Sequence, residues 1–441
     1  MPEYFPENNT PIWTDTEVRS LQKIVGAIEG LTNGGSGGII GSFPTDAFGR
    51  LKTASPLTLF DSSHRYRDNG LWSTYTSGTA SATFNANQGV VDLTVDVASG
   101  DEVIRETTKV FAYQPGKSLL VMNTFVMNQA KTNLRQRVGY YGDDNGIYLE
   151  LYGNALSFVE RSLVTGVVTE TPVLQANWNG DKLDGTGPSG FTLNIANSQI
   201  MWMDIEWLGM GTVRIGFVIN GQFITCHSFH HANLIQSTYI TTASLPLRYE
   251  IKNVGTPSPA TSSTLKQTCS TVISEGGYNL GGAQLSVATT ITSPRSLTTA
   301  GTFYPVISIR LKTSPDRLDA IVILTALSIL PVTTASANYI WRVHAGGVTS
   351  GGTWVSAGTD SAVEYNLTGT SLFDGRILAS GFMNSTNQAT ATTDILKEAL
   401  FKFQLERDGI TGTPYELTLV ASASTNTSNM HASMDWEEVS R

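Results

Sequence analysis

One segment, residues 199–229, constrains the fold most, because it reads as strand, break, strand, turn and strand. Side chains alternate between two faces from Ile200 to Trp207 and again from Thr212 to Ile219, as they do in β-strands. The glycines between these runs break the first strand. Asn220-Gly221 supplies the two positive φ angles of a type I′ turn, so a tight hairpin should follow. These strands predict the sheet core of an antiparallel β-sandwich.

The rest of the chain has the same character. Short apolar runs are separated by turn residues such as Gly100-Asp101, Pro115-Gly116 and Asn145-Gly146, a spacing typical of sandwiches. Only 15% of residues are charged, and Gly occurs 42 times, which favours strands and turns over long helices. We therefore predict an all-β protein: a jelly-roll or lectin-like antiparallel β-sandwich plus a second β-sandwich, with a short N-terminal helix.

The predicted domain order starts with an anchoring helix and a Gly-rich linker in residues 1–42. A jelly-roll sandwich occupies residues 43–254, and a second sandwich occupies residues 265–441. Residues 255–264 are interpreted as a linker because they are rich in Pro, Ser and Thr and lack an apolar pattern.

The N-terminal helix is predicted from apolar side chains at three- and four-residue spacing: Val18, Leu21, Ile24, Val25, Ile28 and Leu31. The run from Asn33 to Gly38 forms a flexible tether behind it. We expect this stripe to mediate oligomerisation or anchoring, with a homotrimeric coiled coil favoured. The alternative is that the helix folds back on its own domain.

Charge and apolar content exclude two classes of partner. A net charge of −9 argues against broad nucleic-acid binding, which needs a basic face. The most apolar run, residues 320–332, is too short to span a bilayer, so no membrane insertion is expected. No secretory signal is visible at the N-terminus. Cys226 and Cys269 give no disulfide framework; they are expected to be free, with a single bridge left open.

The sharpest chemical candidate is the first strand of the opening segment. Trp202, Asp204 and Glu206 share one face, and alternate side chains on a strand lie about 6.5 Å apart. The acidic strand resembles that of retaining glycoside hydrolases of the laminarinase and xyloglucan-transferase group, but Trp202 replaces the nucleophile that retention requires. The interpretations left open are a solvent-facing carboxylate pair, a glycan-binding site in which Trp202 stacks on a sugar, and hydrolysis.

No metal or cofactor is expected. His227, His230 and His231 could bind a metal, but no further ligand lies nearby in sequence. Residues 143–146, DDNG, lack the alternating oxygen ligands of a calcium loop and are interpreted as a type I′ turn. The Gly-rich residues 34–41 lack the GK[ST] of a phosphate loop.

Several motifs carry a resemblance to a known family. They are DAFGRL with PLTLFDS in residues 46–62, YQPGKS in residues 113–118, RVGY in residues 137–140, WNGDKLDGTGPSG in residues 178–190 and LPLRYEI in residues 245–251. The sequence over about residues 43–254 resembles a family of virion structural proteins of tailed bacteriophages from marine and environmental genomes. The family pattern also contains D..WLG.G and a CH.F.HAN motif, which here covers His227 and His230. It implies a structural hydrogen-bond cluster for these histidines and carries over no catalytic residue.

The resemblance implies a non-enzymatic virion protein, made in the bacterial cytoplasm and assembled with copies of itself and other virion proteins. We expect an outward-projecting component of the tail or fibre apparatus, a place where β-sandwiches bind host surface glycans. The alternatives are a head decoration, cement or baseplate protein without a receptor role, and a glycan depolymerase.

Overall fold

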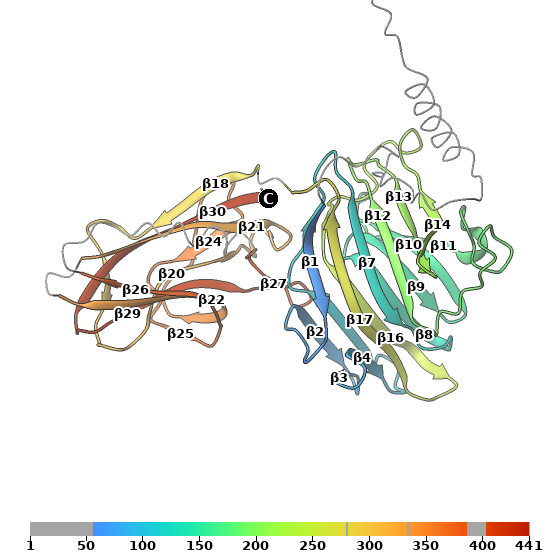
Figure 1. Cartoon of the computed structure of the whole chain (residues 1–441), viewed down its shortest axis with the longest axis horizontal. Helices are drawn as coiled ribbons and strands as arrows, with labels where there is room; N and C mark the ends of the chain where they lie inside the picture. Colours follow the sequence, from blue (N-terminus) through green and yellow to red (C-terminus); the bar gives the residue numbers. More distant parts are fainter. Residues whose placement is uncertain (1–55, 279–280, 333–335, 386–402, 441) are drawn as a thin grey trace, which may run out of the picture. The chain divides into compact units, whose positions relative to one another are not determined.

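The structure is a computed structural model that describes residues 56–278, 281–332, 336–385 and 403–440. The predicted N-terminal helix and its Gly-rich linker, with the apolar stripe from Val18 to Leu31, lie outside the described residues. Apart from one 3-10 turn, η1 (Gln175–Asn177), every regular element in the described part is a β-strand (Figure 1). The predicted all-β class is confirmed.

The first sandwich has two antiparallel sheets. The first sheet has eight strands in the order β14-β13-β12-β7-β17-β4-β3, with β1 also paired to β17. Its strands are β1 (Leu57–Ser63), β3 (Ser81–Asn85), β4 (Val90–Val95), β7 (Leu119–Val126), β12 (Gln199–Ile205), β13 (Val213–Ile219), β14 (Gln222–Phe229) and β17 (Ser263–Ser274).

The second sheet has seven strands in the order β11-β10-β9-β8-β16-β5-β2. They are β2 (Trp72–Ser77), β5 (Glu102–Thr107), β8 (Thr132–Tyr141), β9 (Gly146–Tyr152), β10 (Ala155–Ser162), β11 (Thr169–Leu174) and β16 (Leu247–Ser258). Alternate side chains of both sheets fill one core, among them Met203 from β12 and Ile251 from β16. The two-residue strands β6 (Phe111–Ala112) and β15 (Ser244–Leu245) pair with each other beside it.

The predicted hairpin of the opening segment is confirmed. Ile219 pairs with Gln222, and Asn220 and Gly221 have φ angles of 51° and 78°, as a type I′ turn requires. The turn at residues 143–146 is also a hairpin, between β8 and β9. It is not type I′, because Gly146 is the residue with positive φ there, at 140°.

The predicted boundary between the sandwiches needs correction. Residues 255–264 were expected to be a linker, but β16 extends to Ser258, and β17 lies between β7 and β4 in the first sandwich. The inward face of β17 carries Gln267 and Ser270, both buried. Because polar side chains occupy these core positions, β17 lacks the apolar alternation by which a strand is recognised in a sequence.

The second sandwich has a four-stranded sheet in which β18, β19 and β21 all pair with β30. These strands are β18 (Ala283–Ala288), β19 (Arg295–Leu297), β21 (Ile321–Pro331) and β30 (Ser428–Ser440). The facing sheet has seven strands in the order β23-β24-β20-β29-β22-β25, with β26 also paired to β22. Its strands are β20 (Tyr304–Leu311), β22 (Asn338–Ser350), β23 (Val355–Ser356), β24 (Val363–Asn366), β25 (Ser371–Phe373), β26 (Arg376–Asn384) and β29 (Glu416–Ala423).

The second sandwich has its own core, in which Trp436 of β30 packs with residues such as Leu419 of β29. A two-stranded ribbon, β27 (Arg407–Asp408) and β28 (Thr413–Pro414), follows the residues outside the described part. The Arg407 guanidinium forms an ion pair with Glu106 of β5 at 2.9 Å. It also donates to the carbonyl oxygen of Thr107 at 2.8 Å. This arginine therefore contacts the first sandwich.

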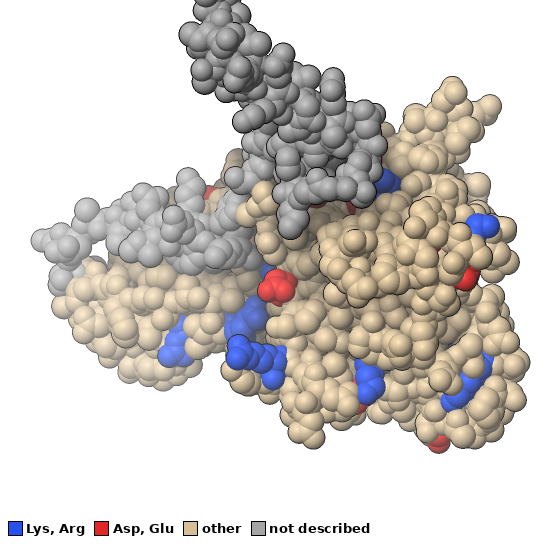
Figure 2. Space-filling view, turned by 45° about the vertical axis from the view of Figure 1, so that its right-hand side comes forward, with Lys and Arg blue, Asp and Glu red and all other residues tan. Residues whose placement is uncertain are grey.

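Charged groups are sparse on one face of the molecule (Figure 2). On the face that Figure 2 presents, most of the described surface carries neither Lys and Arg nor Asp and Glu, in keeping with a charged content of 15%. Many charged side chains are instead buried in ion pairs, as Arg248 and Glu106 are.

Among the described residues, no helix is long and apolar enough to cross a lipid bilayer.

Candidate functional site

The predicted site on β12 is not open to solvent in this structure. Trp202, Asp204 and Glu206 expose only 6%, 6% and 4% of their surface. The Asp204 carboxylate forms an ion pair with Arg214, its neighbour on β13. The Trp202 ring lies against Phe223 of β14, with centroids 5.6 Å apart. Trp202 is therefore not placed to stack on a sugar, and the carboxylates are not the solvent-facing pair expected from alternation.

Glu206 has a separate environment. Strand β12 ends at Ile205, and the Glu206 N–H donates to the carbonyl oxygen of Thr212 at 3.1 Å. A Cβ at Gly211 would lie 2.3 Å from the Glu206 carbonyl oxygen, so this turn needs glycine there. Asp204 therefore lies within β12, whereas Glu206 lies in the turn that follows it.

The histidines have structural contacts. His227 accepts the N–H of Asn179 at 3.2 Å through Nδ1, and His230 lies 3.2 Å from the Thr212 hydroxyl. His231 contacts Glu160 at 2.7 Å. Within the described part of the chain, no group of three or more His, Cys, Asp or Glu side chains could hold a metal ion. These contacts fit the hydrogen-bond role that the family resemblance implies.

The turn after β12 carries a different aromatic residue, Trp207. Leu208 and Gly209 have positive φ angles of 39° and 78°, which reverse the chain. The Gly211 N–H donates to the Trp207 carbonyl oxygen at 2.6 Å. The carbonyl oxygen of Gly209 accepts the N–H of Tyr239 at 3.0 Å. These bonds fix the turn, and Trp207 remains partly exposed at its start.

The segment that faces Trp207 across a cavity is built on the pairing of β6 with β15. The Tyr140 hydroxyl lies between the carbonyl oxygens of Phe111 and Ala243 and accepts the N–H of Leu245 at 3.2 Å. Burial raises the pKa of Tyr140, so its hydroxyl stays protonated and able to donate. The N–H of Tyr113 donates to the Ala243 carbonyl oxygen at 3.3 Å, which extends the pairing beyond β6.

These two walls enclose a cavity of about 540 Å³, which we call the Tyr113/Trp207 pocket. The two rings meet edge to face, with centroids 6.4 Å apart and planes 74° apart. The lining residues are Ala112, Tyr113, Gln114, Pro115, Lys117, Trp207, Thr241, Thr242, Ala243, Ser244, Gly281 and Val439. Aromatic rings beside hydroxyl, amide and ammonium groups suit a polar ring compound such as a sugar, whose C–H and O–H groups need both kinds of contact.

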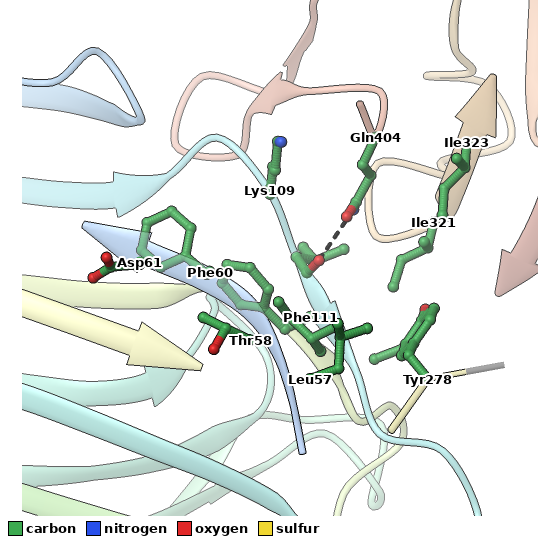
Figure 3. A pocket seen from close by; sticks show the side chains of 13 residues that line it. Leu57, Thr58, Phe60, Asp61, Lys109, Phe111, Tyr278, Ile321, Ile323 and Gln404 are labelled. Carbon is green, nitrogen blue, oxygen red and sulfur yellow. Dashed lines mark hydrogen bonds between the residues drawn. The ribbon is translucent and has the colours of Figure 1, made fainter. Parts of the chain in front are cut away.

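A second cavity is mostly apolar and smaller, at about 360 Å³. Figure 3 shows the apolar side chains that line this space, among them Phe60 on one side and Tyr278 with Ile321 and Ile323 of β21 on the other. The Gln404 side chain donates to the carbonyl oxygen of Val110 at 3.0 Å and so contacts the wall of the cavity. The lining also includes Thr58, Asp61 and Lys109, but apolar side chains make up most of it.

A third cavity, of about 560 Å³, has several charged side chains in its lining, five of them acidic and two of them arginines. Glu106 is paired with both Arg248 and Arg407, and Arg248 also pairs with Asp143 at 2.6 Å. Asp319 also lines this space, and burial raises its pKa. Because its main charges pair with one another, we interpret this cavity as structural.

The sequence prediction did not assign a role to the residues of the Tyr113/Trp207 pocket. A signal was nevertheless available, because Tyr113, Gln114 and Lys117 belong to YQPGKS, and Trp207 belongs to the WLG.G pattern. These motifs lie far apart in the chain and form the two walls of one pocket. Only the fold brings them together.

No protein-family model matches the chain, and no curated protein matches it. Solved structures with some similarity include the carbohydrate recognition domain of Emp47p, at 11% identity and a TM-score of 0.33, covering 52% of this chain and 99% of that one. A protein of unknown function, SO2946 from Shewanella oneidensis MR-1, has 11% identity and a TM-score of 0.33, covering 62% and 99%.

A Bacteroides ovatus GH16 protein in complex with a G4G4G3G product has 10% identity and a TM-score of 0.33, covering 48% of this chain and 99% of that one. We infer nothing about function from similarities of this size.

Proposed function

We propose that this chain is a non-enzymatic structural protein of a tailed-phage virion, which binds a host surface glycan in the Tyr113/Trp207 pocket. The observation that carries the proposal is the composition of that pocket. It combines two aromatic side chains with hydroxyl, amide and ammonium groups, and its walls come from motifs shared with the phage family that the sequence resembles. The place that we propose is the outward-facing tail or fibre apparatus.

The positions of the carboxylates support binding rather than catalysis. Asp204, which the hydrolase alternative would use, forms an ion pair with Arg214, and Trp202 stands where a retaining hydrolase has its nucleophile. The described residues that line the Tyr113/Trp207 pocket include no Asp or Glu. A glycosidase needs two carboxyl groups at the scissile bond, so this pocket is better suited to holding a sugar than to cleaving it.

The apolar stripe in residues 18–31 remains our proposal for oligomerisation and anchoring. An amphipathic helix on a flexible tether buries its stripe on another chain, and a homotrimer or a site on another virion protein would provide that surface. Deleting residues 1–42 should leave folded β-sandwiches and abolish incorporation into particles. Normal incorporation of the shortened chain would contradict the anchoring role.

The direct test is binding of the full chain to an array of bacterial surface polysaccharides, followed by titration calorimetry with the best binder. Trp207→Ala should weaken binding at least tenfold, because it removes one aromatic wall. Gln114→Ala should weaken it less and leaves the aromatic packing intact. Tyr152→Ala, at an exposed aromatic on β9, is the matched control. Wild-type affinity in both pocket variants would refute the proposed site.

The location on the particle needs a separate measurement. Immunogold labelling of intact virions should place the chain at the tail tip or fibres. Label spread over the capsid would instead favour the head-decoration alternative, and label at the tail base would favour the baseplate alternative. Release of reducing ends from a bound polysaccharide by the purified chain would contradict a purely binding role.

A further inference from the structure

The charge of the Tyr113/Trp207 pocket differs from that of the whole chain. Among the described residues that line it, Lys117 is the only charged one, whereas the chain carries a net charge of −9. The charged cavity near Arg248 provides a comparison, because its lining includes Glu106, Asp143 and Asp319. The described lining of the Tyr113/Trp207 pocket is therefore positively charged, although the chain as a whole is negatively charged.

The local structure holds Lys117 in place. Gln114 and Lys117 are joined by a turn in which the Lys117 N–H donates to the Gln114 carbonyl oxygen at 3.1 Å, and Gly116 supplies a positive φ of 81°. The side-chain stem packs against Gly276, where an added Cβ would lie 2.6 Å from Lys117 Cγ. The position of the ammonium group is thus set partly by packing, which lowers the entropy cost of using it to bind.

The ammonium group has a neutral partner in the structure. Lys117 Nζ donates to Gln114 Oε1 at 3.0 Å. The nearby Glu275 carboxylate accepts a hydrogen bond from the Ser118 hydroxyl. Among the described residues no carboxylate forms an ion pair with Lys117, so its positive charge is available to a ligand. A charge-assisted hydrogen bond to a carboxylate is stronger than one to a neutral oxygen.

We infer that the pocket binds an acidic sugar, one whose ring contacts Trp207 and Tyr113 and whose carboxylate pairs with the Lys117 ammonium group. This inference rests on the proposed function and names its ligand class, a carboxylated glycan. Thr241, Thr242 and Ser244 supply hydroxyl groups to the same space. They can form hydrogen bonds with the hydroxyl groups of the sugar ring, while the Lys117 ammonium group favours a sugar that carries a carboxylate.

The test compares a uronic-acid oligosaccharide with its carboxyl-reduced, neutral counterpart of the same length. The full-length wild-type chain should bind the acidic form about tenfold more tightly at low salt, and this preference should shrink as salt is raised. Lys117→Gln should reduce binding of the acidic form to about the level of the neutral one, with a much smaller loss of neutral binding. Lys117→Arg should keep the preference for the acid.

The matched control is Lys266→Gln. Lys266 lies on β17, outside the pocket, and donates to Gln88 Oε1 at 2.6 Å, so its loss should change neither affinity. Equal binding of both forms by wild type, or an equal loss of both in Lys117→Gln, would overturn the acidic preference while leaving glycan binding intact. Absence of binding to either form, together with no binding on the polysaccharide array, would overturn the proposed function itself.

Discussion

His231 and Tyr239 stack face to face, with ring centroids 3.9 Å apart and planes 6° apart. Both ring nitrogens of His231 face acceptors: Nδ1 lies 2.5 Å from the Gly211 carbonyl oxygen, and Nε2 lies 2.7 Å from the Glu160 carboxylate. Only the doubly protonated ring can donate to both. Burial lowers the pKa of His231, but the bonds to Glu160 and Gly211 outweigh it and raise the pKa above its ordinary value.

This charged histidine gives a pH-dependent contribution to stability. The contribution is fully present below about pH 6.5, the ordinary His pKa, and is lost as pH rises through the raised pKa of the folded protein. His231→Gln should lower the free energy of unfolding by about 1.5–3 kcal/mol at pH 5.5, and by less at pH 9. Urea unfolding at the two pH values measures both effects.

The matched control for this prediction is His230→Gln. His230 is exposed and has one described side-chain contact, with Thr212, so its replacement should change stability little at either pH. Equal losses for His231→Gln at pH 5.5 and pH 9 would argue against an imidazolium at position 231. The His231→Gln variant should also weaken glycan binding. His231 contacts the carbonyl oxygen of Gly211, and Gly211 closes the turn that carries Trp207.

The hairpin of the opening segment was predictable because its determinants are local. Alternation assigns Val213, Ile215 and Phe217 to the core, and Asn220-Gly221 determines the turn; all of these predictions are confirmed. Alternation also put Trp202 and Met203 on opposite faces correctly. It could not show that the outer face at Trp202 is buried, because burial depends on what packs there.

Strand β17 shows where sequence pattern fails for a different reason. Its inward residue Gln267 accepts a hydrogen bond from Arg105 at 2.8 Å. The inward Ser270 hydroxyl lies 2.9 Å from that of Tyr249. Such buried polar side chains are stable only when groups on distant strands form hydrogen bonds with them. The local sequence pattern does not show which groups these are. The Tyr113/Trp207 pocket has the same origin, since its walls meet only in the folded chain.

Arg137 should be a major determinant of the stability of the first sandwich. Its buried guanidinium contacts Glu150 at 2.6 Å and Glu170 at 3.1 Å, and lies 4.9 Å from the ring centroid of Tyr148. Arg137→Met removes the cation closest to both carboxylates, and we expect it to lower the free energy of unfolding by about 3–5 kcal/mol. Arg161→Met, which removes only a 3.7 Å contact with Glu170, should have a much smaller effect.

The Arg137 prediction also has a pH signature. Burial raises the pKa of Glu170, but Arg137 outweighs it and the pKa is lowered overall. The stability gained from this carboxylate is therefore present above its ordinary pKa and lost as pH falls through the lowered value. The difference between wild type and Arg137→Met in urea unfolding should shrink from pH 7 to pH 3. An undiminished difference would point to lost packing instead.

The two cysteines should differ in reactivity. Both are free, with Cys226 buried and Cys269 exposed, and burial raises the pKa of the Cys226 thiol to about 12. Since the thiolate is the reactive form, the native protein should react with one equivalent of a disulfide reagent at pH 8, and with two after unfolding. Cys269→Ser should abolish the native reaction. No reaction before chemical reduction, with two equivalents after it, would indicate a disulfide between the two cysteines.

The boundary between the sandwiches can be tested by truncation. A chain of residues 1–278 keeps β17 and should unfold cooperatively. It should be less stable than the full chain, because it loses the Arg407 contacts with Glu106 and Thr107 and exposes Val110 and Ala112, which pack with Ile321 and Ile323. Its melting temperature, followed by near-ultraviolet circular dichroism, measures that loss.

A chain of residues 1–262 follows the boundary expected from the sequence and removes β17. Strand β17 lies between β7 and β4, so its loss leaves one edge of each of these strands without a partner and removes Leu265 and Val272 from the core. Unsatisfied backbone groups on two interior strands cost far more than the few kcal/mol by which a domain is stable. This chain should show no cooperative transition. Cooperative folding of residues 1–262 would mean that β17 is dispensable and would restore the boundary at residue 265.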